Sequence, residues 1–232
     1  MRPGEGETDE DRDIGANPDL IVAVDGPSGS GKSSASRGAA SALGLRYLDT
    51  GATYRALTWW LLEHDIDTGD PDAVVAHVGD GRIEVGTDPG APWTRVDGVD
   101  VTAAIRTREV TDAVSAVARV PQVRARMIAM QRSIIADAGG IVAEGRDIGT
   151  VVAPDAQVKV FLTADGAARA SRRAEQASWS PDATRAEQDR RDRMDAGQSG
   201  KAADAVEVDS TAMSLDEVIG TIVGLARRVR HA

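Results

Sequence analysis

A short run of β-branched residues that leads directly into a glycine-rich loop is the feature that most constrains this chain. Residues 20–24 read LIVAV, which is typical of a strand buried on both faces of a parallel sheet. Residues 26–33 read GPSGSGKS and match G-x-x-x-x-G-K-[ST], and the Ser/Ala-rich segment that follows favours a helix. Strand, loop and helix therefore arrive in the order of a nucleotide-phosphate loop. A merely flexible Gly/Ser loop is the alternative, and this order disfavours it.

The residue types in this loop suit the binding of a nucleoside triphosphate. Glycines let backbone N–H groups turn inward around phosphate oxygens, and the N-terminus of the next helix adds further N–H groups and a positive dipole end. Lys32 is expected to reach the β- and γ-phosphates, and the Ser33 hydroxyl is expected to bind Mg²⁺. The predicted ATP-binding residues are Gly26, Pro27, Ser28, Gly29, Ser30, Gly31, Lys32, Ser33 and Ser34.

Length and composition restrict the other classes of protein. The 232 residues suit one globular domain with an inserted subdomain. No stretch reaches the roughly 18 apolar residues of a membrane span, and no apolar segment lies near the N-terminus, so neither a span nor a signal peptide is expected. The lack of cysteine excludes disulfides and thiolate chemistry, and the three histidines have no metal-ligand spacing. We expect a cytoplasmic protein.

The charge distribution is uneven. A net charge of −10 disfavours nonspecific binding to nucleic acid, which requires a basic footprint. A nucleotide enzyme must then gather positive charge locally, and seven arginines lie between residues 169 and 193. They are either a solvated helical face, laced with acidic residues, or part of a phosphate site.

The order of predicted elements indicates an α/β fold. Residues 1–18 are acidic and almost without apolar side chains, so we expect a disordered tail. Strands are predicted at 20–24, 46–48, 140–143, 157–162 and 205–209. Helices are predicted after the phosphate loop up to residue 43, over 52–64, over 105–138, over 166–195 and from residue 214 onward. The glycine after residue 43 is expected to be a C-cap, the proline at position 121 to start a second helix within 105–138, and residues 214–217 to form a capping box.

Strands that alternate with helices form parallel sheets, whose ligands bind beyond the carboxyl ends of the strands. Asp25, Asp49 and Glu144 are therefore expected at one edge, beside the phosphate loop. Residues 65–104 differ from this pattern, since they contain Gly/Asp/Pro clusters, alternating runs at 82–85 and 93–96, and the hairpin signal Asp97-Gly98. This region is predicted to be a small antiparallel insertion.

The phosphate loop alone does not separate kinases, GTPases and motor ATPases. A guanine-specific GTPase usually carries N-K-x-D, whereas the only asparagine of this chain is Asn17. Motor and AAA-type ATPases are larger and carry a second acidic motif on a long apolar strand. A small kinase that passes the γ-phosphate to a metabolite remains.

Several motifs beyond the loop resemble those of the bacterial cytidylate kinase family, from about residue 20 to the C-terminus. They are LDTGATYR at 48–55, IRT at 105–107, VSAVA at 114–118 followed by PQVR at 121–124, and EGRDIGTVV at 144–152. The resemblance implies phosphate transfer from ATP to CMP or dCMP with Mg²⁺, giving CDP or dCDP. It also implies a P-loop kinase with a five-stranded parallel sheet flanked by helices, an antiparallel monophosphate-binding insert and a mobile helical lid.

This interpretation divides the chain into the tail 1–18 and a single kinase domain 19–232. The core would comprise 19–64, 105–165 and 203–232, the insert 65–104 and the lid 166–202. The implied partners are the small molecules CMP and dCMP, with neither nucleic acid nor a membrane, and the expected state is a monomer.

The resemblance also implies residue roles. Arg55 and Arg146 would clamp the acceptor phosphate, as guanidinium forks suit a phosphate that must be aligned for attack. The remaining substrate-binding residues would be Thr50 and Tyr54 near the monophosphate, Ser115, Arg124 and Asp147 as readers of cytosine, and Arg191 and Asp195 at the ribose. The predicted catalytic residues are Lys32, Arg146 and Arg191.

Some alternatives stay open at the level of sequence. Arg146 could instead form a local ion pair with Asp147, and either Glu144 or Asp25 could order the Mg²⁺ shell. Gln198 stands where the family usually has another arginine, so either Lys201 supplies the missing charge or lid closure is weakened. A kinase for another small acceptor, or a catalytically weak regulatory protein on the same fold, are the alternative functions.

Overall fold

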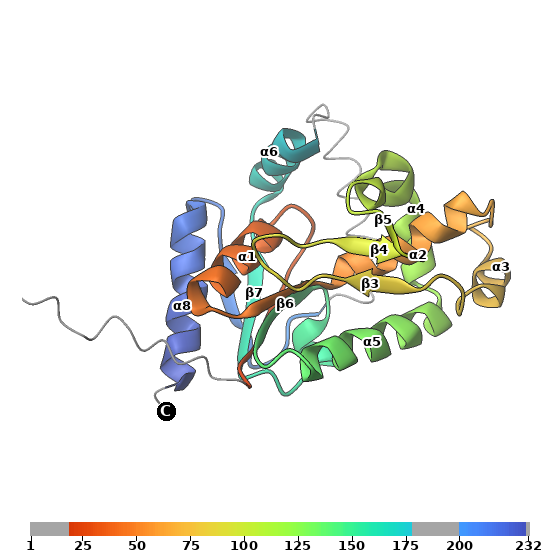
Figure 1. The fold of residues 1–232 in the computed structure, drawn as a ribbon. Helices are drawn as coiled ribbons and strands as arrows, with labels where there is room; N and C mark the ends of the chain where they lie inside the picture. Colours follow the sequence, from red (N-terminus) through yellow and green to blue (C-terminus); the bar gives the residue numbers. More distant parts are fainter. Residues whose placement is uncertain (1–18, 178–199, 231–232) are drawn as a thin grey trace, which may run out of the picture.

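The computed structural model describes residues 19–177 and 200–230, which form a parallel sheet covered by helices on both faces (Figure 1). The strand order is β2-β6-β1-β7-β8, and every neighbouring pair is parallel. The strands are β1 (Ile21–Asp25), β2 (Arg46–Asp49), β6 (Ile141–Gly145), β7 (Val158–Thr163) and β8 (Val206–Asp209). The predicted five-stranded parallel sheet is confirmed, and the strand that precedes the phosphate loop lies at its centre.

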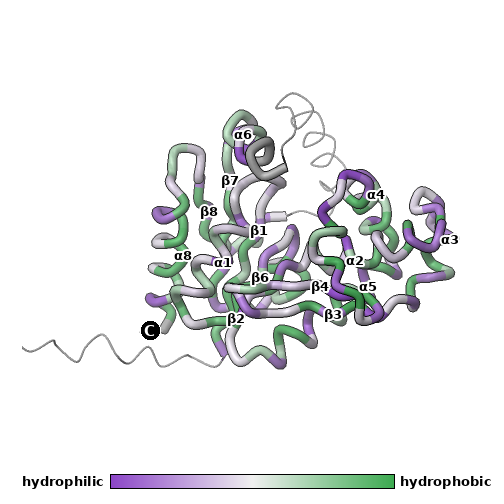
Figure 2. Tube along the Cα trace, turned by 45° about the horizontal axis from the view of Figure 1, so that its top comes forward, coloured by the Kyte–Doolittle hydropathy of each residue, from purple (hydrophilic) through white to green (hydrophobic). Residues whose placement is uncertain are grey.

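The two faces of the sheet are buried by different helices. Val22 and Val24 point toward α1 (Lys32–Leu43) and α8 (Leu215–Arg230), whereas Ala23 points toward α5 (Pro121–Ala136) and a π-helical turn at Ile148–Val152. Figure 2 shows hydrophobic residues alternating with polar ones along α8, as expected for a helix with one buried face. Burial on both faces explains why the central strand β1 is an uninterrupted apolar run up to Asp25.

Several helix boundaries follow the predicted capping chemistry. Gly44 ends α1 with a φ of 66°, in the left-handed region that glycine adopts without strain. Pro121 occupies the first turn of α5, where its missing N–H group is not needed. At the start of α8 the Ser214 backbone N–H donates to Glu217 Oε2 at 2.8 Å, and the Glu217 N–H donates to Ser214 Oγ at 3.3 Å. The capping box is confirmed.

The region between α2 (Thr50–Glu63) and α4 (Arg108–Ala118) forms a separate antiparallel sheet, as predicted. Its strands are β3 (Ile83–Val85), β4 (Thr94–Val96) and β5 (Val99–Asp100), and Asp97-Gly98 is the turn between β4 and β5, with positive φ at both residues. Ile83 and Val96 pack with Trp60 of α2 and Met127 of α5 in a core distinct from those beside the main sheet.

Four elements were not anticipated from the sequence. The short helix α3 (Pro71–Ala76) was assigned to the insertion without a helix, although Asp70 caps it by accepting from the Asp72 N–H at 3.0 Å. The two-residue strand β5, the 3₁₀ turn Ala104–Arg106 and the π-helical turn are also too short for periodicity to reveal. In addition, α2 begins at Thr50 rather than Ala52, because Asp49 accepts from the Ala52 N–H at 3.1 Å and caps the helix.

The arginine-rich segment is described only in its first part. Helix α6 (Gly166–Ala177) begins where the helical region was predicted, and positions 178–199 lie outside the described residues, as does the predicted tail 1–18. Within the described ranges, none of the helices has the length and apolar character needed to cross a bilayer.

Candidate active site

A cleft of about 460 Å³ lies at the carboxyl edge of the main sheet, where the sequence places it. Strand register brings Asp25 beside Gly145 and Asp49 beside Glu144, so the predicted acidic residues do meet at this edge. The predicted site residues that line the cleft are Ser28, Gly29, Ser30, Gly31, Lys32, Ser33, Ser34, Thr50, Tyr54, Arg55, Ser115, Arg124, Arg146 and Asp147. Arg191 and Asp195 lie outside the described residues.

The phosphate loop connects β1 to α1 and is held close to the sheet at its first glycine. Gly26 has a φ of 152°, and a Cβ atom there would lie 2.1 Å from the Leu162 carbonyl oxygen of β7. Only glycine fits this approach. Gly26 and Pro27 do not line the cleft, so they shape the loop, whereas residues 28–34 face the cleft. Lys32 Nζ donates to the Pro27 carbonyl oxygen at 3.2 Å.

Three arginines donate to carbonyl oxygens of this loop. Arg146 Nη1 donates to the Gly26 oxygen at 2.7 Å, Arg169 Nη1 to the Ser28 oxygen at 3.1 Å and Arg172 Nη1 to the Ser30 oxygen at 3.3 Å. Arg172 also donates to the Ser210 hydroxyl at 2.9 Å and carbonyl at 2.7 Å, which links α6 to the segment after β8. Arg169 and Arg172 therefore contact the loop, and their role at a phosphate stays a prediction.

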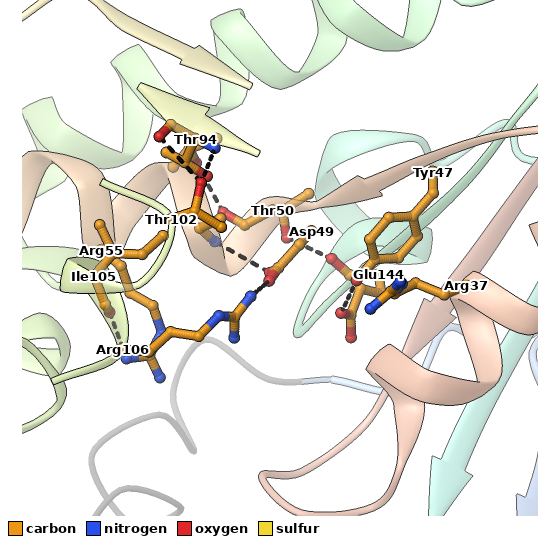
Figure 3. Close-up of polar contacts among 12 residues, drawn as sticks. Arg37, Tyr47, Asp49, Thr50, Arg55, Thr94, Thr102, Ile105, Arg106 and Glu144 are labelled. Carbon is orange, nitrogen blue, oxygen red and sulfur yellow. Dashed lines mark hydrogen bonds and ion pairs between the residues drawn. The ribbon is translucent and has the colours of Figure 1, made fainter. Parts of the chain in front are cut away.

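Two acidic residues, Asp49 and Glu144, line the cleft together with Lys32 and Ser33. Figure 3 shows Glu144 beside Tyr47. Burial raises the pKa of Glu144, as does the negative charge of Asp49, whereas Lys32 and hydrogen bonds from Ser33 and Tyr47 act to lower it. The Tyr47 hydroxyl donates to Glu144 Oε1 at 2.7 Å. Glu144 is thus a buried carboxylate that faces the loop lysine and the predicted metal-binding serine.

Neighbouring groups fix this acidic pair in place. Arg106 Nη2 forms an ion pair with Asp49 Oδ2 at 3.0 Å, and in Figure 3 its guanidinium points at the Asp49 carboxylate. The Thr50 hydroxyl donates to the Glu144 carbonyl oxygen at 2.6 Å. A Cβ atom on Gly145 would lie 2.5 Å from that hydroxyl oxygen, so the start of α2 packs directly on the end of β6.

The opposite side of the cleft is built from α2, α4, α5 and the segment after β6. Arg55 Nη1 donates to Thr111 Oγ1 at 3.0 Å and to the Ile105 carbonyl oxygen at 3.4 Å (Figure 3). Arg124 forms an ion pair with Asp147, so the carboxylate that could have paired locally with Arg146 has a partner on α5. Ser115 is buried and lines the same part of the cleft.

Tyr54 lies between these groups. Burial raises the pKa of Tyr54 to about 12, with Arg124 lowering it and Asp147 raising it. Its hydroxyl therefore stays protonated at neutral pH and can act as a hydrogen-bond donor. Together these residues present guanidinium, carboxylate and hydroxyl groups to one volume, a set that can bind both a phosphate and a nucleobase.

Asp25 differs from the other acidic residues at this edge because it does not line the cleft. Its side chain is buried, and its two oxygens accept the backbone N–H groups of Ile148 and Gly149, each at 2.8 Å. Burial raises the pKa of this carboxyl, and the two backbone hydrogen bonds act against that rise. Of the two acids considered for the metal shell, only Glu144 faces the cleft.

The residues that can hold a metal are therefore the Ser33 hydroxyl and the Glu144 carboxylate. In the described part of the chain no group of three or more His, Cys, Asp or Glu is arranged to hold a metal ion. Mg²⁺ does not need such a cage, because it usually takes one or two protein oxygens, several waters and the phosphates of the substrate. An oxygen set of one hydroxyl and one carboxylate fits this chemistry.

The sequence assigned no role to several residues of the cleft. Asp49 was expected at this edge of the sheet but was given no function, and Arg106 stands inside the quoted motif IRT without an assigned role. Met213, Leu215 and Val218 also line the cleft, and nothing in the sequence distinguishes them from ordinary apolar residues. Lys201, considered as a substitute for a lid arginine, forms an ion pair with Glu207 at 2.8 Å on the surface.

Comparisons with known proteins agree with this geometry. The sequence model of the cytidylate kinase family matches residues 22–228. The chain is similar to a cytidylate kinase of Streptomyces griseus, with 52% identity over 94% of this chain and 96% of that protein. A cytidylate kinase of Streptomyces coelicolor is 54% identical, over 92% of this chain and 95% of that protein.

Among solved structures, an uncharacterised protein from Eubacterium ventriosum aligns with a TM-score of 0.51 at 11% identity, covering 90% of this chain and 99% of that chain. At this identity the likeness concerns the fold alone.

Proposed function

The chain belongs to the cytidylate kinase family, and from this membership we infer that it transfers the γ-phosphate of ATP to CMP or dCMP, giving ADP and CDP or dCDP. The observation that carries the inference is that a phosphate loop and a second group of arginine, carboxylate and hydroxyl side chains line one and the same cleft. A donor triphosphate and an acceptor monophosphate can lie in it together.

We assign the donor side to residues 28–34 and to Arg169 and Arg172 of α6, which contact the loop. The loop N–H groups would surround the phosphates, and Lys32 would leave the Pro27 carbonyl to reach the β- and γ-phosphates. Arg169 and Arg172 already lie against the loop carbonyls, so they supply positive charge beside the transferring group. In this proposal they belong to the lid, residues 166–202, together with Arg191, for which the proposed role follows from the family resemblance.

Mg²⁺ would be held by the Ser33 hydroxyl and, through the ion's own water shell, by Glu144. When bound, the ion would neutralise charge that develops on the phosphate oxygens. The remaining contributions come from this chain: the loop and the arginines align the donor, and the buried Glu144 balances the charge of Lys32 beside it.

We assign the acceptor side to Arg55, Arg146, Ser115, Arg124 and Asp147. The two guanidiniums of Arg55 and Arg146 would bind the acceptor phosphate, with Thr50 and Tyr54 beside it. Cytosine offers an exocyclic amine donor next to the N3 and O2 acceptors. A carboxylate such as Asp147 can accept from the amine, while the paired Arg124 can donate to the ring acceptors. Asp195 and Arg191 are proposed to hold the ribose.

This arrangement requires no strong general base. Phosphoryl transfer depends mainly on positioning and on electrostatic stabilisation, and a closed cleft excludes water that would hydrolyse ATP. The three-stranded sheet of region 65–104 is proposed to be the monophosphate-binding insert, because its helical neighbours α2 and α4 carry Arg55 and Ser115. We propose a monomer, located in the cytoplasm where ATP is supplied.

The experiment that tests this function measures ADP formation from ATP with CMP, dCMP, UMP and AMP offered separately. We expect CMP and dCMP to be phosphorylated, and UMP and AMP to react much more slowly. A preference for another acceptor would show that the cleft reads a different base. The absence of turnover with all four would favour a regulatory protein on the same fold.

A further inference from the structure

The carboxylate of Asp25 is not used in the chemistry proposed above, although it ends β1 and directly precedes the phosphate loop. It is 4% exposed and does not line the cleft. A buried carboxylate is costly unless its oxygens are fully hydrogen-bonded. Its partners therefore indicate what it does.

Both partners of Asp25 belong to the segment that carries the proposed acceptor residues. Oδ1 accepts the Ile148 N–H and Oδ2 accepts the Gly149 N–H, each at 2.8 Å. These N–H groups come immediately after Arg146 and Asp147 in the chain. From the other direction, Arg146 Nη1 donates to the Gly26 carbonyl oxygen at 2.7 Å. Three hydrogen bonds thus join residues 25–26 to residues 146–149.

The two joined segments serve opposite sides of the cleft. Gly26 begins the phosphate loop and is itself held against β7 by the close approach to Leu162. Asp147 pairs with Arg124 in the proposed base-reading group, and Arg146 lines the cleft beside it. Ile148 is fully buried in the core, so its side chain and the Asp25 hydrogen bonds hold the same segment.

We propose that Asp25 is a positioning residue, which fixes the acceptor-binding segment Arg146–Gly149 against the phosphate loop and so sets the distance between acceptor and donor. The inference rests on the proposed roles of Arg146 and Asp147. Transfer between two phosphates is sensitive to such alignment, because a misplacement of about 1 Å can lower the rate by about a hundredfold.

The alternative roles of Asp25 make different predictions. A carboxylate of the Mg²⁺ shell would have to face the cleft, as Glu144 does, and its loss would raise the Mg²⁺ requirement. A purely structural role would weaken ATP binding and both acceptors in proportion. Loss of a positioning role lowers kcat/KM for the acceptor and changes the preference between CMP and UMP. ATP binding in the absence of acceptor is preserved.

The test is Asp25→Asn, which keeps the shape of the side chain but replaces one acceptor oxygen with an NH₂ group that faces a backbone N–H. We expect kcat/KM for CMP to fall by about tenfold to a hundredfold, because a buried backbone group loses its partner. The CMP-to-UMP preference should shrink, since Asp147 is no longer held in register. The dissociation constant for ATP without acceptor should change by less than about threefold, within the scatter of uncoupled sites. The half-saturating Mg²⁺ concentration should stay the same.

Arg132→Met is the matched control. Arg132 donates to the carbonyl oxygens of Val151 at 2.7 Å and Val152 at 3.1 Å, at the far end of the same turn. The Arg132→Met substitution therefore weakens the π-helical turn but leaves the hydrogen bonds between Asp25 and the turn in place. We expect a lower melting temperature with the CMP-to-UMP preference of the wild type. If both variants change the preference alike, the turn as a whole is responsible and the role of Asp25 is refuted.

Gly149→Ala keeps the inference testable if Asp25→Asn fails to fold. Its Cβ would make an ordinary contact with Asp25 Oδ2 at 3.5 Å and would crowd Cδ of the flexible Lys159 side chain at 3.2 Å, so it perturbs the Gly149 end of the Asp25 contact only slightly. We expect a smaller loss of the same kind. An unchanged CMP-to-UMP preference in these variants, with a wild type that prefers CMP, overturns only this inference. A wild type that does not phosphorylate CMP overturns the proposed function together with it.

Discussion

The two sides of the cleft are built differently. On the side of the phosphate loop, the consecutive residues 28–34 line the cleft, whereas the opposite side of the cleft is formed by side chains of α2, α4, α5 and the end of β6. On the loop side, Arg169 and Arg172 of α6 donate to backbone carbonyl oxygens of the loop. On the opposite side, arginines also contact other side chains, Arg124 that of Asp147 and Arg55 that of Thr111.

This difference predicts how mutations on each side of the cleft change the activity with different acceptors. A site made of backbone N–H groups and a lysine binds phosphate whatever the acceptor, so its loss should reduce every reaction equally. A site made of paired side chains distinguishes acceptors, so its loss should change the ratios between them. The four substitutions that follow test whether the two sides of the cleft act separately, or distinguish residues within one side.

Lys32→Ala should have the largest effect and should not distinguish acceptors. Removing a cation from a transferring phosphoryl group is expected to lower kcat by about a hundredfold to a thousandfold, the usual cost of losing a single electrostatic group. Activity with CMP, dCMP and UMP should fall in parallel, with a melting temperature close to that of the wild type. Lys201→Ala is the control, because Lys201 pairs with Glu207 on the surface. Near-normal activity in Lys32→Ala would refute the loop assignment.

Glu144→Gln should have the next largest effect. It tests whether Glu144 acts with the phosphate loop that it faces in space or with the acceptor residues that follow it in the sequence. Glu144 stands two residues before Arg146, yet it faces Lys32 and Ser33. We expect kcat to fall by about tenfold to a hundredfold, as for a buried charged group that loses its role, and the half-saturating Mg²⁺ concentration to rise. The loss should be equal for CMP and UMP. A changed CMP-to-UMP ratio would instead place Glu144 with the acceptor side.

The loop side could be predicted almost completely from the sequence. A contiguous motif specifies it, and its strand and helix boundaries follow local rules such as the glycine after Leu43. The alternation of strands and helices also predicted the parallel sheet. The strand order could not be predicted, because it depends on which buried faces pack together, and no local pattern encodes that β6 lies between β2 and β1.

The acceptor side was accessible only through family resemblance. Ser115, Arg124 and Asp147 lie on three elements, and no spacing rule joins them. The bonds that hold them in place were also invisible, including the Arg124–Asp147 pair and the two backbone hydrogen bonds of Asp25. From the sequence, Asp25 and Glu144 were equivalent acids at strand ends. Only burial and partners separate them, since one faces the cleft and the other faces the backbone of a turn.

Asp147→Asn should have a moderate effect and should change the ratio between acceptors. If Asp147 accepts from the cytosine amine, then UMP presents a carbonyl oxygen to a carboxylate. An unpaired charged acceptor costs about 1.5–3 kcal/mol, or roughly tenfold to a hundred-and-fiftyfold in kcat/KM. The amide of asparagine can either accept or donate, so CMP activity should fall and the CMP-to-UMP preference should shrink. The ATP requirement should not change. An unchanged ratio would refute the base-reading role and leave Asp147 only as the partner of Arg124.

Thr111→Val should have the smallest effect and should divide the acceptor side into its two tasks. Thr111 is buried on α4, and its hydroxyl accepts from Arg55 Nη1 at 3.0 Å, while valine has nearly the same shape without the acceptor oxygen. Arg55 keeps the Ile105 carbonyl, so the loss is that of a single hydrogen bond, about 0.5–1.5 kcal/mol or roughly twofold to tenfold. Because the proposed role of Arg55 is to bind the acceptor phosphate, which CMP and UMP share, KM should rise equally for both and their ratio should stay that of the wild type. Asp147→Asn should change the CMP-to-UMP preference, whereas Thr111→Val should change only the binding of the phosphate that both acceptors share. Steady-state kinetics with both acceptors at saturating ATP measure this, and a shifted ratio in Thr111→Val would mean that Arg55 and the base-reading residues act as one unit.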